Sequence, residues 1–257
     1  MDQEMQEKID KLQQQMDKIE YRMLMLEDML LAGGKMRKCP ICKSEFIAYL
    51  PSGEKLRSGA KCPKCGAAER HRAMWLYIHQ RKDIRRLLKK KIRVLHFAPE
   101  KSIRPLFDGK KNIDYYPVDI NPEFRGIRET ADITDLKYPD EYFDIIVCNH
   151  VLEHIEDETA ALRNLKRVLK PDGIAFLNAP VFKSKETLEN PAYNTPELRF
   201  KYFGQSDHVR RYGQDYPQRL EKAGFKVKMI LNGDLFSKKT ILKYRLQKEE
   251  QQVVCRK

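Results

Sequence analysis

Four cysteines are the residues whose type and spacing most clearly predict chemistry. Cys39 and Cys42 form one Cys-x-x-Cys turn, and Cys62 and Cys65 form a second after nineteen intervening residues. Each turn directs two thiolates at one point, and tetrahedral zinc takes four soft ligands of this kind. The spacing predicts a zinc ribbon over residues 35–68 that holds structural Zn²⁺. A four-cysteine shell has no open coordination position, so we expect no catalysis there.

Disulfide bonds are the competing interpretation of these cysteines. We favour the metal because the chain starts without a signal peptide and is expected in a reducing compartment. Cys148 lies in an apolar run and Cys255 in a polar tail, so neither has a partner at ligand spacing.

Three further residues match the HxxEH motif of inverted zinc proteases, namely His150, Glu153 and His154. That motif needs both histidines on one helix, whereas His150 directly follows the pattern of a buried strand. We therefore disfavour a protease. We expect His154 to be a structural or crevice-wall residue and His150 to face a substrate.

The length and composition limit the possible protein classes. With 257 residues, 34% charged and 41% hydrophobic, the chain has room for one substantial globular domain plus small attachments. No run reaches the roughly 18 apolar residues of a membrane span. The polar N-terminus is unlike a signal peptide, so we expect a cytoplasmic protein.

The positive charge is concentrated in one segment. Of the net charge of +13, residues 39–93 carry +11. Such a patch attracts nucleic acid, anionic lipid or a polyphosphorylated substrate, or it is simply a solvated helix face. Residues 69–92 within it are predicted to form one basic linker helix between the ribbon and the main domain.

The N-terminal residues 1–34 predict an assembly helix. Apolar residues alternate at spacings of four and three, which is the 3.5-residue repeat of a coiled-coil seam. The sequence therefore predicts a homo-oligomer, with a dimer as the base-rate choice. The alternative is a helix docked on its own chain, because Leu24, Met25, Met29 and Leu31 widen the stripe. The seam consists of Met5, Ile9, Leu12, Met16, Ile19, Met23, Leu26 and Leu30.

From residue 93 the pattern changes to short apolar runs alternating with helical stretches, which indicates an open parallel sheet flanked by helices. Strands are expected at 93–97, 114–118, weakly at 126–128, then at 144–148 and 173–177. Two more, at 225–231 and 240–246, have no predicted helix between them and should pair antiparallel at one edge. In such sheets ligands bind at the carboxyl ends of the strands.

Over residues 90–247 the sequence resembles class I S-adenosylmethionine (SAM)-dependent methyltransferases. The motifs that carry the resemblance are VLHFAPE at 94–100, PVDIN at 117–121, ADITDL at 131–136, YFDIIVCNHVLEHI at 142–155 and LKRVLKPDGIAFLNAP at 165–180. The resemblance implies an α/β fold with a Rossmann-like seven-stranded methyltransferase sheet over 93–257, preceded by the ribbon and the coiled-coil helix.

The resemblance also implies a SAM site. Asp119 matches the acid that accepts the ribose hydroxyls, and Asp132 matches the residue that binds the adenine amino group, with Ile133 beside it. Glu100 is expected at the methionine amino group or as a helix N-terminal acid. The first motif departs from the family because it lacks the usual glycines, as a subgroup variant would. The expected cofactor-binding residues are Phe97, Ala98, Pro99, Glu100, Asp119, Ile120, Asp132, Ile133 and Asn149.

The long segment at 181–218 predicts a lid over the acceptor site. Residues 203–213 resemble the FGQxDHVRxYG pattern of methyltransferases that modify glycans and small molecules. His208 is the leading candidate for the base, with His150 as the second catalytic candidate. Arg210 and Arg211 are expected either to hold an anionic group or to pack within the lid.

Three functions remain open. The favoured one is O-methylation of a small molecule or glycan. The second is RNA methylation, with the basic ribbon binding the phosphate backbone. The third is a non-catalytic zinc-ribbon scaffold with a degenerate cofactor fold.

Overall fold

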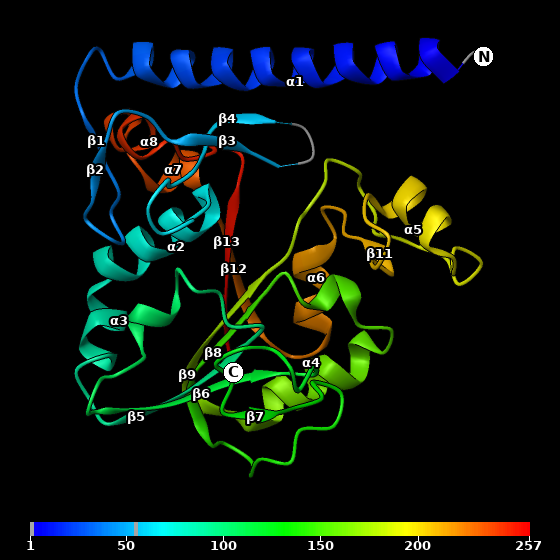
Figure 1. Cartoon of the computed structure of the whole chain (residues 1–257). Coiled ribbons are helices and arrows are strands. Elements are labelled where there is room, and N and C mark those ends of the chain that lie inside the picture. Colours follow the sequence, from blue (N-terminus) through cyan, green and yellow to red (C-terminus); the bar gives the residue numbers. More distant parts are fainter. Residues whose placement is uncertain (1–2, 54–55) are drawn as a thin grey trace. The chain divides into compact units, whose positions relative to one another are not determined.

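The computed structural model describes residues 3–53 and 56–257 (Figure 1). Met1 and Asp2, inside the predicted coiled-coil helix, and Glu54 and Lys55, inside the predicted ribbon, lie outside the described residues. The chain divides into two compact units. Unit 1 comprises residues 1–80 and 231–250, and unit 2 comprises residues 81–230 and 251–257.

Unit 1 begins with the long helix α1 (Gln3–Leu31), which ends at two glycines with positive φ, Gly33 and Gly34. Its C-terminal part is attached to the ribbon through Asp28, which is fully buried. The Asp28 carboxylate accepts hydrogen bonds from Arg37 Nη2 at 2.9 Å and from the Tyr49 N–H at 2.8 Å. A buried carboxylate needs partners of this kind, so this end of α1 is fixed to its own unit.

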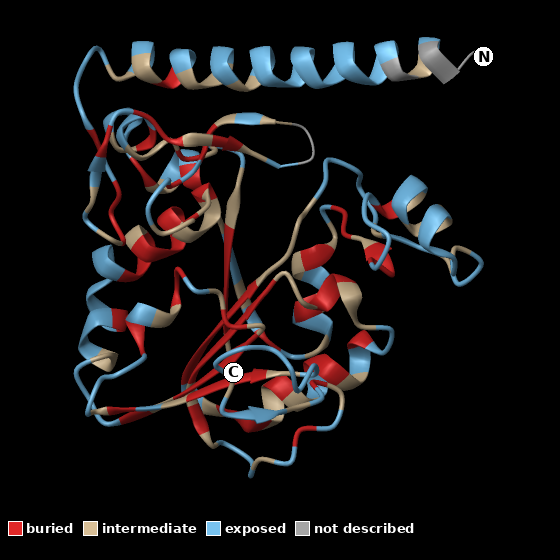
Figure 2. Cartoon of the chain, in the orientation of Figure 1, coloured by how far each residue is buried: buried red, intermediate tan, exposed pale blue. Residues whose placement is uncertain are grey.

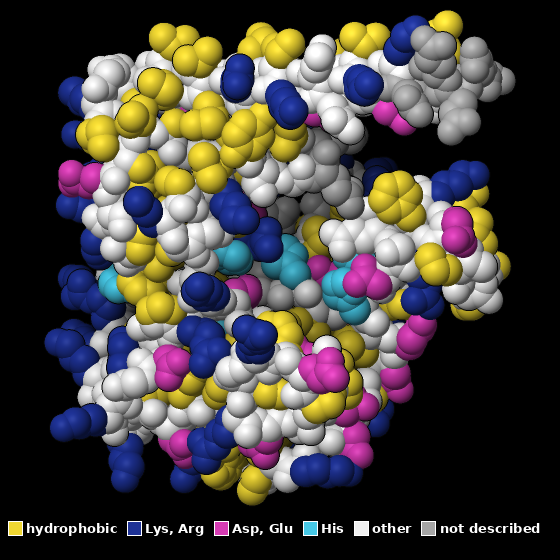
Figure 3. Space-filling model, in the orientation of Figure 1, with side chains coloured by type: hydrophobic (Ala, Val, Ile, Leu, Met, Phe, Trp, Pro, Cys, Tyr) yellow, Lys and Arg dark blue, Asp and Glu magenta, His cyan; other side chains and the backbone are white. Residues whose placement is uncertain are grey.

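The predicted seam of α1 stays uncovered. Its eight residues are between 44% and 80% exposed. Figure 2 shows α1 as mostly exposed, and Figure 3 shows hydrophobic side chains spaced along the side turned away from β3 and β4. Leu24, Met25 and Met29 are only partly exposed. The helix thus has a docked end and a free apolar stripe on different faces.

The ribbon consists of two short antiparallel pairs. β1 (Arg37–Lys38) pairs with β2 (Glu45–Phe46), and β3 (Leu50–Ser52) pairs with β4 (Arg57–Lys61). Helix α2 (Glu69–Gln80) follows, and two helices from the C-terminal part of the chain complete the unit, namely α7 (Asn232–Leu235) and α8 (Lys238–Tyr244).

Arg72 of α2 connects these parts of unit 1. It is fully buried, and its guanidinium lies 4.1 Å from the Tyr49 ring centroid. All its N–H-bearing nitrogens donate to backbone carbonyls, which belong to Gly59, Ala60, Ala67, Tyr244 and Arg245. The arginine therefore joins β4 and the second cysteine turn to the end of α8.

Unit 2 contains a seven-stranded sheet in the order β12-β13-β9-β8-β5-β6-β7. The contacts among β5, β6, β7, β8 and β9 are parallel, and β13 runs antiparallel to β9. The strands are β5 (Ile92–Phe97), β6 (Ile113–Asp119), β7 (Glu129–Thr130), β8 (Phe143–Asn149), β9 (Leu169–Asn178), β12 (Lys226–Leu231) and β13 (Gln251–Arg256).

One face of the sheet is covered by α4 (Glu158–Val168) and α6 (Tyr216–Lys222). Leu162 and Leu165 of α4 and Tyr216 and Leu220 of α6 join side chains of the sheet in one buried cluster. The remaining elements of this unit are α3 (Lys82–Leu87), the 3₁₀ turns η1 (Arg104–Leu106) and η2 (Leu152–His154), and, in the segment predicted to be a lid, β10 (Leu188–Glu189), α5 (Pro196–Phe203) and β11 (Arg210–Arg211). This is the Rossmann-like sheet that the sequence predicts.

The predicted strand at 240–246 is wrong. Residues 238–244 form α8, whose Ser237 side chain caps the helix by accepting the Thr240 N–H. The last strand is instead β13, in which Cys255 is buried, so its assignment to a polar tail is also wrong. A short apolar run such as ILKYRL fits a helix or a strand equally well, and burial decides between them.

Two smaller predictions also need correction. The basic segment after the ribbon is not one helix, because Arg81 adopts an extended conformation that separates α2 from α3. The weak strand expected at 126–128 lies slightly later, at β7. Gly126 precedes it with φ +80°, which is a turn conformation.

Candidate functional site

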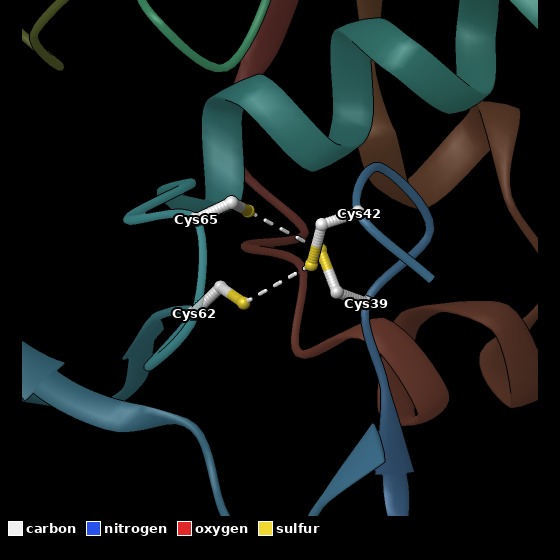
Figure 4. Close-up of side chains that lie close together, drawn as sticks. All are labelled: Cys39, Cys42, Cys62 and Cys65. Carbon is white, nitrogen blue, oxygen red and sulfur yellow. Dashed lines mark hydrogen bonds between the residues drawn. The ribbon is translucent and has the colours of Figure 1, made fainter. Parts of the chain in front are cut away.

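The four cysteines of the ribbon form a compact cluster (Figure 4). Cys39 Sγ lies 3.8 Å from Cys65 Sγ, and Cys42 Sγ lies 3.9 Å from Cys62 Sγ. Four sulfurs about 2.3 Å from a tetrahedral zinc ion lie about 3.8 Å apart. A disulfide needs about 2.05 Å, and all four thiols are free. The donor set fits zinc and does not fit a pair of disulfides.

The two cysteine turns repeat one backbone geometry. The N–H of Lys43 donates to the Cys39 carbonyl at 3.1 Å, and the N–H of Gly66 donates to the Cys62 carbonyl at 3.0 Å. Lys43 has φ +62° and Gly66 has φ +72°, so a residue in the left-handed backbone conformation follows each pair of cysteines. This turn points both thiols of a pair to one side.

In unit 2, the loops after β5, β6 and β7 are connected at the carboxyl edge of the sheet. The Ala98 N–H donates to the Val118 carbonyl, and the Ala131 N–H donates to the Asp119 carbonyl, each at 3.0 Å. Ala98 has φ +42°, a left-handed conformation that costs an L-residue about 1–2 kcal/mol. The loop therefore adopts with alanine a conformation that glycine would adopt without strain.

A chain of hydrogen bonds fixes Glu100 beside this loop. His96 Nε2 lies 2.7 Å from Glu100 Oε2, and Asn149 Nδ2 donates to Glu100 Oε1 at 3.0 Å. Asn178 Nδ2 in turn donates to Asn149 Oδ1 at 2.8 Å. These residues come from β5, β8 and β9, so three neighbouring strands position one carboxylate.

A pocket of about 930 Å³ adjoins the loop that follows β5. Ala98, Pro99 and Glu100 line it on one side, and residues 124–126, which follow β6, line it on another. Three of the residues predicted to bind the cofactor thus share one cavity wall.

The other predicted cofactor residues take different positions. Asp119 ends β6, and its Oδ1 accepts the Asn121 N–H at 2.8 Å. Asp132 Oδ1 accepts both the N–H and the hydroxyl of Thr134. Ile120 is 67% exposed.

Two further members of the predicted set point into the core. The side chains of Phe97 and Ile133 both belong to the buried cluster that α4 and α6 cover. Only their backbone groups are available to a ligand at the carboxyl edge.

The two histidines predicted to be catalytic meet at one group of side chains. His150 follows β8 with φ +54°, and its Nδ1 lies 3.4 Å from Glu153 Oε1. His208, from the loop before β11, packs edge-on against His154 with ring centroids 4.7 Å apart. Burial, reinforced by the nearby charge of His154, lowers the pKa of His208. His208 therefore stays neutral over a wider pH range than a free imidazole.

Arg210 is buried and joins the 181–218 segment, which the sequence predicts to be a lid, to η2. Its guanidinium donates to the carbonyls of Leu152 and Glu156 at 2.8 and 3.0 Å and pairs with Glu189 Oε1 at 2.6 Å. Arg211 lies 4.3 Å over the Phe182 ring. Of the two earlier interpretations of Arg210, these contacts favour lid packing over anion binding.

Sequence reasoning gave no role to Glu153 or to His96. Glu153 was visible only as part of the disfavoured HxxEH motif, and it lies with His154 on the 3₁₀ turn η2 and not on a helix. His96 occupies a core position of β5, and nothing in the sequence indicates that its ring contacts Glu100.

Comparison with known proteins bears on this edge of the sheet. Residues 102–177 match the methyltransferase domain family. The matched segment begins just after the loop that follows β5 and ends within β9. It therefore includes Asp119, Asp132 and Asn149.

Short stretches of the chain are similar to curated methyltransferases. The C-methyltransferase UbiE of ubiquinone and menaquinone biosynthesis from Vibrio vulnificus is 42% identical over 55 residues, which are 20% of this chain and 21% of that protein. Phosphoethanolamine N-methyltransferase 1 from Arabidopsis thaliana is 31% identical over 103 residues, covering 38% and 18%. The malonyl-acyl-carrier-protein O-methyltransferase of Halorhodospira halophila is 34% identical over 111 residues, covering 42% and 34%. The chain thus spans between 18% and 34% of each of these relatives, whose names specify methyl transfer to carbon, nitrogen and oxygen.

Solved structures with a similar architecture are distant. A SAM-dependent methyltransferase from Archaeoglobus fulgidus is 16% identical with a TM-score of 0.47, covering 72% of this chain and 94% of that one. A Haloferax volcanii methyltransferase in complex with its activator Trm112 is 16% identical with a TM-score of 0.48, covering 73% and 90%. The fold assignment rests on the strand order itself. Within residues 3–53 and 56–257, no helix combines the length and hydrophobicity of a membrane span.

Proposed function

We propose that the protein is a SAM-dependent methyltransferase that O-methylates a small molecule or a glycan. The observation that carries the proposal is the match of residues 102–177 to the methyltransferase domain on a sheet whose carboxyl edge has a pocket. Bound SAM supplies an electrophilic methyl group, and the chain must hold the cofactor and align an acceptor with it.

The cofactor would be held by the loops after β5, β6, β7 and β8. We assign the ribose hydroxyls to Asp119, the methionine amino group to Glu100, and the adenine to Asp132 and the backbone of Ile133. The hydrogen bonds of Glu100 to His96 and Asn149 support its part, because they fix a carboxylate in the pocket wall. The remaining contacts are assigned to Ile120, to Asn149 and to the backbone of Phe97, Ala98 and Pro99.

A hydroxyl acceptor must lose a proton during transfer, and two histidines are our candidates for accepting it. The His150 side chain is 31% exposed at the end of β8, whereas His208, within the 181–218 segment, is buried. The 181–218 segment, which carries His208, would close over the acceptor.

We further propose that the ribbon binds structural Zn²⁺ and that α1 forms a homo-oligomer, with a dimer as the simplest case. Sulfur spacings near those of a tetrahedral zinc site support the first statement. The second is supported by the exposure of all eight seam residues, since a monomer would leave that stripe in water.

RNA methylation is the second candidate, because residues 39–93 carry most of the excess positive charge. The structure weakens this alternative at one position. Arg72 is buried with its guanidinium bonded to carbonyls, so it contributes no surface contact to a phosphate.

The test is methyl transfer from radiolabelled SAM to a panel of sugars, hydroxylated small molecules and total RNA. We expect labelling of a hydroxyl compound, and loss of that labelling in His150→Ala with SAM affinity unchanged. Labelling of RNA alone, with binding that weakens steeply as salt rises, would replace the first candidate with the second. Full activity in both His150→Ala and His208→Ala would remove both histidines as bases.

A further inference from the structure

Besides the cysteines, one other group of side chains in the described residues has the composition of a metal site. Ligand atoms of Glu153, His154 and His208 all lie within 4.8 Å of one another. Glu153 and His154 belong to η2, and His208 belongs to the loop before β11. The Val209 N–H donates to the Glu153 carbonyl at 2.9 Å, which fixes the lid strand against η2.

Glu153 supplies the observation that points to a ligand. Its side chain is only 2% exposed, and its Oε2 has no hydrogen-bond partner among residues 3–53 and 56–257. The other oxygen, Oε1, is 3.4 Å from His150 Nδ1. A carboxylate oxygen buried without a cation or a donor is costly, so this oxygen calls for a positive group or a hydrogen-bond donor.

His154 already has the outer contact that metal-bound imidazoles use. His154 Nδ1 lies 3.2 Å from Asp207 Oδ2. Histidines that bind metals usually donate their second ring nitrogen to a carboxylate or a carbonyl, which fixes the ring and its tautomer. The His154 ring is therefore oriented through Nδ1, and its other nitrogen can serve as a ligand.

We propose that Glu153, His154 and His208 bind a divalent transition-metal ion of the Mn²⁺ or Fe²⁺ class. Two imidazoles and one carboxylate on one side of an ion leave open positions on the other. Donors at right angles to one another and about 2.1 Å from an ion lie about 3.0 Å apart. Ligand atoms up to 4.8 Å apart must therefore move closer together when the ion binds.

The site deepens the proposed function and depends on it only for its use. An oxygen of the methyl acceptor would occupy an open position of the ion, whose charge makes a hydroxyl easier to deprotonate. His208 would then be a ligand, and the proton-accepting role would fall to His150. Metal binding itself is tested without turnover, so its failure is distinguishable from failure of the methyltransferase proposal.

The experiment is titration of Mn²⁺ into the 257-residue chain loaded with one Zn²⁺ per chain, with free Mn²⁺ followed by electron paramagnetic resonance. Zinc keeps the thiolates occupied, and Mn²⁺ binds soft sulfur ligands weakly. The variants are His208→Ala and the nearly isosteric Glu153→Gln, which retains the shape of the buried side chain. His79→Ala, an exposed histidine of α2, is the control.

We expect one Mn²⁺ per chain, with affinity at least tenfold weaker in both Glu153→Gln and His208→Ala and unchanged in His79→Ala. Circular dichroism verifies that the variants are folded. If His208→Ala does not fold, the affinity of Glu153→Gln decides the matter. Absence of Mn²⁺ binding in the wild type would overturn the proposal. Equal affinity in wild type and Glu153→Gln would overturn it as well.

Discussion

Replacing Arg72 by lysine should destabilise unit 1 strongly, although the charge is kept. The arginine donates to five backbone carbonyls, whereas a lysine ammonium has three N–H groups. At least two carbonyls then lose this donor. Each buried group without a partner costs about 1–3 kcal/mol, so we expect a loss of about 2–6 kcal/mol in the free energy of unfolding.

The assay is urea unfolding followed by tryptophan fluorescence. The chain has one tryptophan, Trp75, which lies one turn from Arg72 on α2 and is nearly buried, so its emission reports on unit 1. Arg22→Lys, at an exposed position of α1, makes the same chemical change without the carbonyl contacts and should alter stability by under about 0.5 kcal/mol. If Arg72→Lys proves as stable as Arg22→Lys, the carbonyl contacts do not hold unit 1 together.

Three other predictions concern the metal, the seam and the lid. Chelation of zinc should unfold unit 1 and shift Trp75 emission to the red, because ligand binding there contributes directly to folding; unchanged emission in protein shown to be zinc-free would contradict this. Met16→Glu should reduce the mass in sedimentation velocity to the 30.4 kDa of one chain, whereas Gln14→Glu should not; a wild-type monomer would refute the seam. Burial alone would raise the pKa of Glu189, but Arg210 and Arg219 outweigh it and lower that pKa. The ion pairs of Glu189 with the two arginines stabilise the fold above the ordinary pKa of a glutamate, and this stabilisation is lost as the pH falls through the lowered pKa. Between about pH 5 and 3, the melting temperature of the wild type should therefore fall more than that of Glu189→Gln.

The parallel part of the sheet was predictable because its strands are continuous apolar runs. Segments such as 144–148 are buried on both faces, so the pattern leaves little choice. The C-terminal part was not predictable in the same way. The sequence predicts a strand where α8 forms and a polar tail where β13 forms. Hydrophobicity alone does not show that α8 packs within unit 1 or that β13 pairs with β9.

The candidate sites also differ in how far the sequence could predict them. Cysteine spacing is a local signal, and the structure brings the four thiols together. By contrast, the cluster at Glu153 combines a 3₁₀ turn with a loop more than fifty residues later, and only the path of the lid brings His208 to His154. The loop after β5, at residues 97–100, lies between these cases. The sequence indicates its position but not that His96 and Asn149 support Glu100.

The most direct test of the central claim is isothermal titration of the zinc-loaded protein with SAM and with S-adenosylhomocysteine, beside Asp119→Ala. Asp119 lies at the end of β6 with its carboxylate partly exposed, so this change should remove ribose contacts without unfolding the sheet. We predict micromolar binding of both compounds by the wild type and loss of binding in Asp119→Ala. Absence of binding in folded wild-type protein would contradict the methyltransferase account and favour a scaffold built on the same fold.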